Sequence, residues 1–128
     1  MKIDHIAFWV EDLERMKKFY QQYLHMECNE KYENKHKAFS SYFLSYGNGA
    51  RIEIMHRPDI PEQEGRKGLA NGPAHLAISV GSRIRVDQLT ELLRRDGFEI
   101  IGEPRITGDG FYESIIADPE GNHLEITE

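Results

Sequence analysis

The chain of 128 residues contains one cysteine, Cys28, and no long apolar run. A single cysteine excludes an intrachain disulfide and any zinc cluster built from cysteine ligands, and it fits a reducing compartment. No segment approaches the ~18 apolar residues that a membrane span needs. Export signals typically consist of a basic region followed by an apolar stretch. The N-terminal residues lack this pattern. We therefore expect a cytoplasmic protein that makes no membrane contact.

Basic residues are also fewer than acidic ones: the chain has 16 Lys and Arg against 22 Asp and Glu, which gives a formal net charge of −6. Binding to nucleic acid requires cations clustered on one face, and the basic cluster Arg94–Arg95 is short. We interpret it as the end of a helix, where cations complement the helix dipole. The composition, 39% hydrophobic and 30% charged, is that of an ordinary globular domain. A domain of this size folds without a structural metal, so a bound metal would serve function.

The two halves of the sequence repeat each other. Residues 5–10 (HIAFWV) match residues 75–80 (HLAISV) at an offset of 70, and residues 49–54 match residues 121–126 at an offset of 72. An internal repeat of this kind fixes the architecture before any local interpretation does. The protein is therefore predicted to consist of two equivalent half-units.

Each half-unit is predicted to contain one helix and four strands. In the first half Asp12 is a good N-cap, and in the second Gly97 is a good stop signal. Residues at helical spacing form one apolar stripe in each half: Leu13, Met16, Phe19, Tyr20, Tyr23 and Leu24, then Val86, Leu89, Leu92 and Leu93. Three further strand-like runs follow each helix: 28–33, 39–46 and 51–55, then 98–101, 112–117 and 123–127.

The predicted fold class is therefore α+β, with two tandem βαβββ modules that form a concave mixed sheet. We expect a single domain over 1–128, made of a half-unit at 1–56, a linker at 57–73 and a half-unit at 74–128. The linker is rich in Pro, Gly and charge and lacks apolar periodicity.

Strand alternation assigns two His and two Glu to equivalent places in the two halves. His5 and His75 lie opposite the aliphatic residues of their strands, and so do Glu53 and Glu125. If the halves are related by a pseudo-twofold axis, equivalent residues meet near that axis and form a His2Glu2 cluster. Imidazole and carboxylate ligands suit one divalent ion: Ni, Zn, Co, Mn or Fe. Four protein ligands leave two positions of an octahedron open, which indicates catalysis.

These residues carry a resemblance to a known family. The HIA segment at 5–7, the IEI segment at 52–54, the AHLA segment at 74–77 and the ending DPEGNHLEI at 118–126 resemble the vicinal oxygen chelate superfamily. This superfamily includes glyoxalase I, bleomycin-resistance proteins and extradiol dioxygenases. The likeness spans nearly the whole chain, and the DPxGxxxE ending is fairly specific for the superfamily but not for one activity.

The resemblance implies that His5, Glu53, His75 and Glu125 hold a divalent metal ion, and that Glu125 or Glu53 acts catalytically by moving a substrate proton. The leading hypothesis is a metal-dependent lyase or isomerase of lactoylglutathione lyase type, acting on a small α-oxo substrate. A fosfomycin-type epoxide-opening enzyme is the alternative that the Gly-rich segment 104–112 favours. Extradiol dioxygenation and a non-catalytic drug-binding protein of the same fold are further alternatives, and both fit four metal ligands less well.

Three residues are candidates for binding substrate: Arg51, Trp9 and Tyr112. Arg51 shares a strand face with Glu53, where it either holds an anionic group or forms an ion pair within the sheet. Trp9, with Phe39 and Phe43, either lines a ligand pocket or forms a core or dimer contact. Tyr112 and Glu113 fall on opposite faces of one strand, so at most one of them faces the cavity. Relatives of this length commonly dimerise, and we expect a homodimer whose site lies within one chain or across two.

Overall fold

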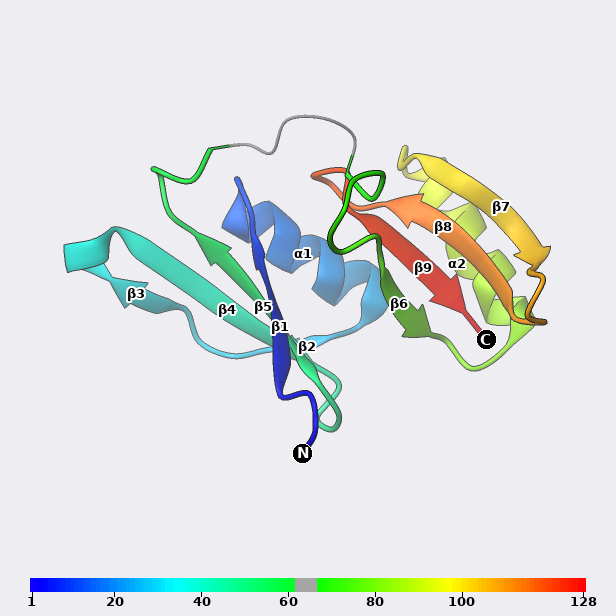
Figure 1. The fold of residues 1–128 in the computed structure, drawn as a ribbon, viewed down its shortest axis with the longest axis horizontal. Coiled ribbons are helices and arrows are strands. Elements are labelled where there is room, and N and C mark those ends of the chain that lie inside the picture. The colour runs from blue at the N-terminus through cyan, green and yellow to red at the C-terminus, as the bar shows by residue number, and fades with distance from the viewer. Residues whose placement is uncertain (62–66) are drawn as a thin grey trace. The chain divides into compact units, whose positions relative to one another are not determined.

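The computed structural model describes residues 1–61 and 67–128. The chain divides into two compact units, Met1–Gln63 and Glu64–Glu128, and each contains one helix beside its own mixed sheet (Figure 1). The two βαβββ modules of the predicted α+β fold are therefore confirmed. Residues 62–66 of the predicted linker lie outside the described residues. In the described part of the chain, no helix is long and apolar enough to cross a membrane.

The first unit folds around helix α1. Its elements are β1 (His5–Trp9), α1 (Leu13–Leu24), β2 (Glu27–Cys28), β3 (Tyr32–Asn34), η1 (Lys35–Lys37), β4 (Phe39–Ser45) and β5 (Arg51–His56). The sheet order is β1-β5-β4-β2, with β3 also paired to β4. β1 runs parallel to β5, and β4 runs antiparallel to it. The predicted strand 28–33 is thus two short strands, which pair with different parts of β4.

Helix α1 begins and packs as the sequence predicts. The Asp12 carboxylate accepts a hydrogen bond from the backbone N–H of Arg15 at 2.9 Å, and His25 ends the helix in the left-handed region. The predicted stripe is mostly buried: Leu13, Met16, Phe19, Tyr20 and Leu24. It contacts β4 and β5, where Ile52 and Ile54 are buried on the helix side. The opposite face of this sheet is therefore available for polar residues.

The second unit repeats the plan around helix α2. Its elements are β6 (Leu76–Ser79), α2 (Arg83–Arg95), β7 (Ile100–Ile106), β8 (Tyr112–Ala117) and β9 (His123–Thr127), in the sheet order β6-β9-β8-β7. Leu124 and Ile126 are buried on the side of α2. The hydroxyl of the buried Thr90 lies 2.7 Å from that of Ser114 and also donates to the Val86 carbonyl oxygen. This polar link inside the core was not predicted, because Thr90 interrupts the apolar stripe.

Strand β7 differs most from its prediction. It extends to Ile106, beyond the predicted end at residue 101, and its register with β8 shifts between Ile100 and Gly102 and again between Gly102 and Arg105. Such bulges bend an edge strand and redirect its side chains. Because of these register shifts, the sequence 102–106 lacks alternation of apolar and polar residues. Periodicity therefore could not predict this part of the strand.

Candidate functional site: two histidine–glutamate pairs

The first predicted pair meets on the sheet face opposite α1. His5 is the first residue of β1, and Glu53 lies on the neighbouring strand β5, next to Ala7. The His5 Nε2 atom lies 3.8 Å from the Glu53 carboxylate, whose side chain is 15% exposed. Two groups that bind metals well are thus close together, and one of them is largely shielded from water.

Asp4 orients the His5 ring. Its carboxylate lies 2.8 Å from His5 Nδ1 and also accepts a hydrogen bond from Arg51. These hydrogen bonds, first that to His5 and then that to Arg51, lower the pKa of Asp4. A carboxylate on Nδ1 fixes the tautomer that leaves the lone pair on Nε2, the arrangement found around metal-bound histidines. The sequence did not indicate this role, because Asp4 precedes the strand.

Aromatic rings surround this pair on the same face. Phe43 lies beside Glu53 in the sheet and makes an edge contact with the His5 ring at 5.4 Å. Trp9, which is 42% exposed, contacts Phe39 at 6.1 Å. Of the predicted substrate-binding residues, Trp9 thus lies on the same sheet face as Glu53. Arg51 stacks its guanidinium on the Phe43 ring at 4.4 Å and forms an ion pair with Asp4. The side chains beside this pair are therefore mainly aromatic, apart from the Asp4–His5–Arg51 group.

The second pair has the same geometry in the second unit. His75 immediately precedes β6, and Glu125 lies on β9 beside Ala77, as Glu53 lies beside Ala7. The His75 Nε2 atom is 3.4 Å from the Glu125 carboxylate, which is 16% exposed. Repetition of one geometry in two units of different sequence argues against a chance contact.

A second carboxylate, Glu113, lies on the Glu125 face. In the antiparallel β8–β9 ladder Glu113 pairs with Thr127 and Ile115 pairs with Glu125, so these side chains share one face. Glu113 is 8% exposed, and Arg105 donates to its carboxylate at 3.1 Å. Burial, followed by the nearby charge of Glu125, raises the pKa of Glu113. The sequence predicted that at most one of Glu113 and Tyr112 lies on this face, and the structure places Glu113 there.

Tyr112, the third predicted substrate-binding residue, lies on the opposite face of the same sheet. Its hydroxyl donates to Asp87 of α2 at 2.7 Å, and this hydrogen bond raises the pKa of Tyr112. Arg83 stacks over its ring at 5.2 Å. The structure therefore does not bring Tyr112 together with Glu125, because odd and even positions of β8 face opposite sides.

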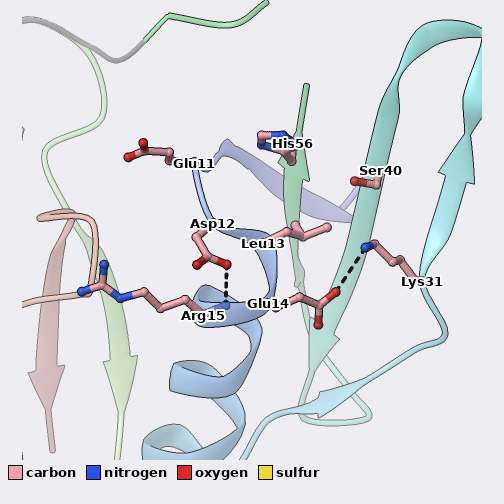
Figure 2. Close-up of a pocket in the computed structure, with 8 residues that line it drawn as sticks. All are labelled: Glu11, Asp12, Leu13, Glu14, Arg15, Lys31, Ser40 and His56. Carbon is pink, nitrogen blue, oxygen red and sulfur yellow. Dashed lines mark hydrogen bonds and ion pairs between the residues drawn. The ribbon is translucent and has the colours of Figure 1, made fainter. Parts of the chain in front are cut away.

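A separate pocket lies in the first unit at the start of α1 (Figure 2). It is lined by Glu11, Asp12, Leu13, Glu14, Arg15, Lys31, Ser40 and His56. Ser40 and His56 pair across β4 and β5 on the helix side of the sheet, opposite Glu53. Lys31 forms an ion pair with Glu14 at 3.2 Å. This pocket is therefore distinct from the His5–Glu53 pair, and its Lys31 is already paired with a carboxylate.

The chemistry of the two pairs fits a divalent metal ion. Bond lengths of about 2.0–2.2 Å put neighbouring ligand atoms of one metal ion roughly 3.0 Å apart in an octahedron and roughly 3.4 Å apart in a tetrahedron, and the observed separations are 3.8 and 3.4 Å. Among residues 1–61 and 67–128, however, no three His, Cys, Asp or Glu side chains form a group able to hold a metal. Each unit taken alone thus holds one His–Glu pair, two of the four ligands that the sequence predicts.

Comparisons with known proteins agree with this fold. Residues 2–126 match the family model of the Glyoxalase/Bleomycin resistance protein/Dioxygenase superfamily. The chain is 30% identical to lactoylglutathione lyase of Haemophilus influenzae, and the match covers 100% of this chain and 93% of that protein.

Solved structures share the fold. A glyoxalase family protein from Enterococcus faecalis matches with a TM-score of 0.77 and 25% identity, over 99% of this chain and 97% of that one. Glyoxalase I from Zea mays matches with a TM-score of 0.80 and 22% identity, over 98% of this chain but 44% of that longer one. The chain therefore belongs to the Glyoxalase/Bleomycin resistance protein/Dioxygenase superfamily, and a bacterial relative of similar length is named lactoylglutathione lyase.

Proposed function

We propose that the protein is a divalent-metal-dependent lyase or isomerase of glyoxalase type that acts on a small α-oxo substrate. The observation that carries this proposal is the His–Glu pair that recurs, at the same place in the sheet, in both units. The named relative supports the reaction class. The substrate belongs to the proposal, because superfamily members share a fold and differ in their reactions.

In this proposal both pairs bind one metal ion through His5, Glu53, His75 and Glu125. Two imidazoles and two carboxylates neutralise a divalent charge, and both carboxylates are already largely removed from water. When bound, the ion would act as a Lewis acid on adjacent oxygens of the substrate. The Asp4 carboxylate would keep His5 in the tautomer that can bind metal.

One of the two glutamates would also move the proton. A carboxylate beside the α-oxo group takes the proton from one substrate carbon and returns it to the neighbouring carbon, so no net oxidation occurs. Because Glu53 and Glu125 hold equivalent positions, either of them can perform this step. The aromatic side chains on the Glu53 face would exclude water from it.

Metal content, measured by elemental mass spectrometry on untagged protein, tests the site. About one Ni, Zn, Co, Mn or Fe per chain is expected in the wild type, and the His75→Ala and Glu125→Ala variants should lose it. His36→Ala is the matched control, because His36 is exposed and belongs to neither pair. If no ion binds after supplementation with each metal, the enzyme proposal is wrong and a metal-free binding protein remains.

Activity on the hemithioacetal of methylglyoxal and a thiol tests the reaction class. The loaded protein should convert it to the thioester of lactate, and a chelator should abolish the conversion. A protein that binds metal but turns over only an epoxide substrate would instead be an epoxide-opening enzyme, the alternative that the segment 104–112 favours.

Mixing two inactive variants tests whether the protein is a homodimer with sites across two chains. If half-units of different chains form each site, a mixture of His5→Ala and His75→Ala chains regains one intact site in each heterodimer, after exchange of subunits. If each chain forms its own site, the mixture stays inactive. Size-exclusion chromatography with light scattering would give the oligomeric state in the same samples.

A further inference from the structure

The chain contains five asparagines, and the structure divides them into two groups. In three of them the side-chain amide forms a hydrogen bond of 2.7–3.2 Å: Asn29, Asn34 and Asn122. The other two, Asn48 and Asn71, are exposed and lie outside the helices and strands. Among residues 1–61 and 67–128, neither of these two side chains has a hydrogen-bond partner. Their amide groups can therefore turn toward the neighbouring backbone.

A glycine follows each of the two exposed asparagines. A Cβ atom built on Gly49 or Gly72 would meet nothing within 4 Å, so no atom crowds these residues. Within the described part of the chain, neither glycine N–H donates a hydrogen bond. The three hydrogen-bonded asparagines are followed by Glu, Lys and His instead. Each Asn–Gly pair thus places an amide carbonyl carbon next to an unhindered backbone nitrogen.

This arrangement permits a covalent reaction within the chain. The glycine nitrogen loses its proton to water or hydroxide and attacks the side-chain carbonyl carbon of the asparagine. The new C–N bond closes a succinimide ring, the bond to the side-chain nitrogen breaks, and ammonia leaves. Water then opens the ring at either carbonyl and gives aspartate or isoaspartate, so the net reaction consumes one water and releases one ammonia. The attack needs no other reactant, because the chain itself holds the two groups together.

Isoaspartate has a longer backbone than aspartate, and the two sites differ in how they would transmit this change. The main chain of isoaspartate runs through the former side chain and gains one C–C bond, about 1.5 Å. Glu53, which follows Asn48, lies within β5 and is held by ladders to both β1 and β4. His75, which follows Asn71, precedes the first residue of β6, and the sheet order places β6 at an edge. The position of His75 therefore depends on the segment before it.

That segment, residues 68–74, forms a small loop whose ends touch. A Cβ atom built on Gly68 would lie 2.7 Å from the Ala74 carbonyl oxygen and would also collide with the ring of His123 on β9. Gly68 is thus packed against both the end of the loop and the last strand of the unit. Asn71 lies midway along this loop, so a longer backbone there changes the path that leads to His75.

We propose that Asn71 is a self-modification site, at which the chain forms isoaspartate through a succinimide, and that the longer backbone displaces His75. The modification itself does not depend on the proposed function. Its effect on metal binding does, because that effect requires His75 to be a metal ligand.

Peptide mapping by mass spectrometry, on folded protein incubated at mildly alkaline pH, tests the modification. Asn71 and Asn48 should each gain about 1 Da and should be found mainly as isoaspartate, and the rate should rise with pH because the attacking nitrogen loses a proton. Asn29, Asn34 and Asn122 should stay unchanged. An Asn71 that stays intact while Asn48 reacts would overturn the proposal. Equal reaction at all five asparagines, or reaction at none, would also overturn it.

The imidazole resonances of ¹⁵N-labelled protein test the displacement of His75. The chain carries Asn48→Gln, so that only residue 71 reacts, and ion exchange separates the modified form by its additional negative charge. The His75 resonance, assigned by its loss in His75→Ala, should shift, whereas that of the exposed His36 in the first unit should not. Fresh Asn71→Asp protein is the matched control, because it has the new charge and the ordinary backbone. An equal shift in this control, or no shift in the isoaspartate form, would refute the displacement.

Metal content links this inference to the proposed site. The form with isoaspartate at residue 71 should bind metal about 10- to 100-fold more weakly, the range for disturbances around a ligand. Asn71→Gln protein modified at Asn48 should bind metal as the unmodified protein does. Equal binding by all forms would show that His75 keeps its place. If the unmodified protein binds no metal either, the proposed function is wrong, while the mass and resonance measurements still decide this inference.

Discussion

The two units hold the same pair of residues in different surroundings. In the first unit, aromatic rings surround His5 and Glu53, and Phe43 is the cross-strand neighbour of Glu53. In the second unit the equivalent neighbour of Glu125 is Ile115, and an ion pair of Glu113 and Arg105 lies on the same face. The buried Ser41 holds the position in the first half that Glu113 holds in the second.

This difference indicates which parts of the repeat are constrained. The His and Glu positions, the adjacent alanines Ala7 and Ala77, and the helix-side cores are alike. The side chains one strand further from each pair differ. The first half therefore presents aromatic rings beside its pair, and the second half presents charged groups beside its pair.

The largest expected effect concerns Glu53→Gln and Glu125→Gln, which test whether the two pairs are chemically equivalent. Both variants should bind metal more weakly, because a neutral amide replaces an anionic ligand. Assayed at saturating metal, one of them should lose about 10²- to 10⁴-fold in kcat, because only one glutamate serves as the base. Equal kcat values in the two variants would show that neither glutamate alone is the base.

A second comparison concerns the turns before the last strand of each unit. In the second turn the buried Asp118 accepts hydrogen bonds from the backbone N–H groups of Glu120 and Asn122 and from the Asn122 side chain, at 2.7–2.9 Å. Tyr46, 72 residues earlier, is exposed. Asp118→Ala should lower the free energy of unfolding by about 2–3 kcal/mol, because these donors lose their acceptor.

Urea denaturation followed by circular dichroism would measure this change. Tyr46→Ala is the matched variant, and surface substitutions typically change stability by about 0.5 kcal/mol or less. Similar losses in both variants would mean that the two turns contribute equally.

A smaller effect is expected at Asp4, which has no counterpart in the second unit because Ala74 holds the equivalent position. Asp4→Ala would make the surroundings of His5 like those of His75. Metal affinity should fall about tenfold, the low end for residues that orient a ligand, because Asp4 is exposed. Competition with a fluorescent chelator measures this affinity. An unchanged affinity would show that Asp4 only pairs with Arg51.

The smallest expected effect is on the pH dependence of stability. The folded state raises the pKa of Glu113 above its ordinary value of 4.5, by burial and then by the charge of Glu125. The folded state then binds the proton more tightly than the unfolded state, so this carboxyl lowers stability as pH rises from 4.5 through the folded pKa. Glu113→Gln should therefore gain stability relative to the wild type over this window, in protein without added metal.

Denaturation curves at a series of pH values would show this divergence. Ser41→Ala, at the equivalent place in the first unit, should differ from the wild type by a constant amount over the same window, because serine does not titrate there. A Glu113→Gln variant whose difference from the wild type does not change with pH would contradict the predicted shift.

Much of the fold could be predicted from the sequence. The repeat, the Asp12 cap and the apolar stripe of α1 are local patterns, and the structure confirms them. The metal-ligand roles of His5, Glu53, His75 and Glu125 stay predictions, although their pairwise proximity agrees with alternation. The sheet face of Arg105 could not be predicted in this way, because a bulge interrupts the period of two on which alternation depends.

The sequence by itself therefore determined the two βαβββ units, the faces of their regular strands and the membership of the superfamily, since each depends on residues near one another in the chain. Only the tertiary structure decided what lies beside each pair. The hydrogen bonds between Asp4 and His5 and between Tyr112 and Asp87 depend on side-chain orientation. The position of Arg105 beside Gly102 depends on a shifted register. Orientation and register arise when strands pair and helices pack, and no local pattern in the chain encodes them.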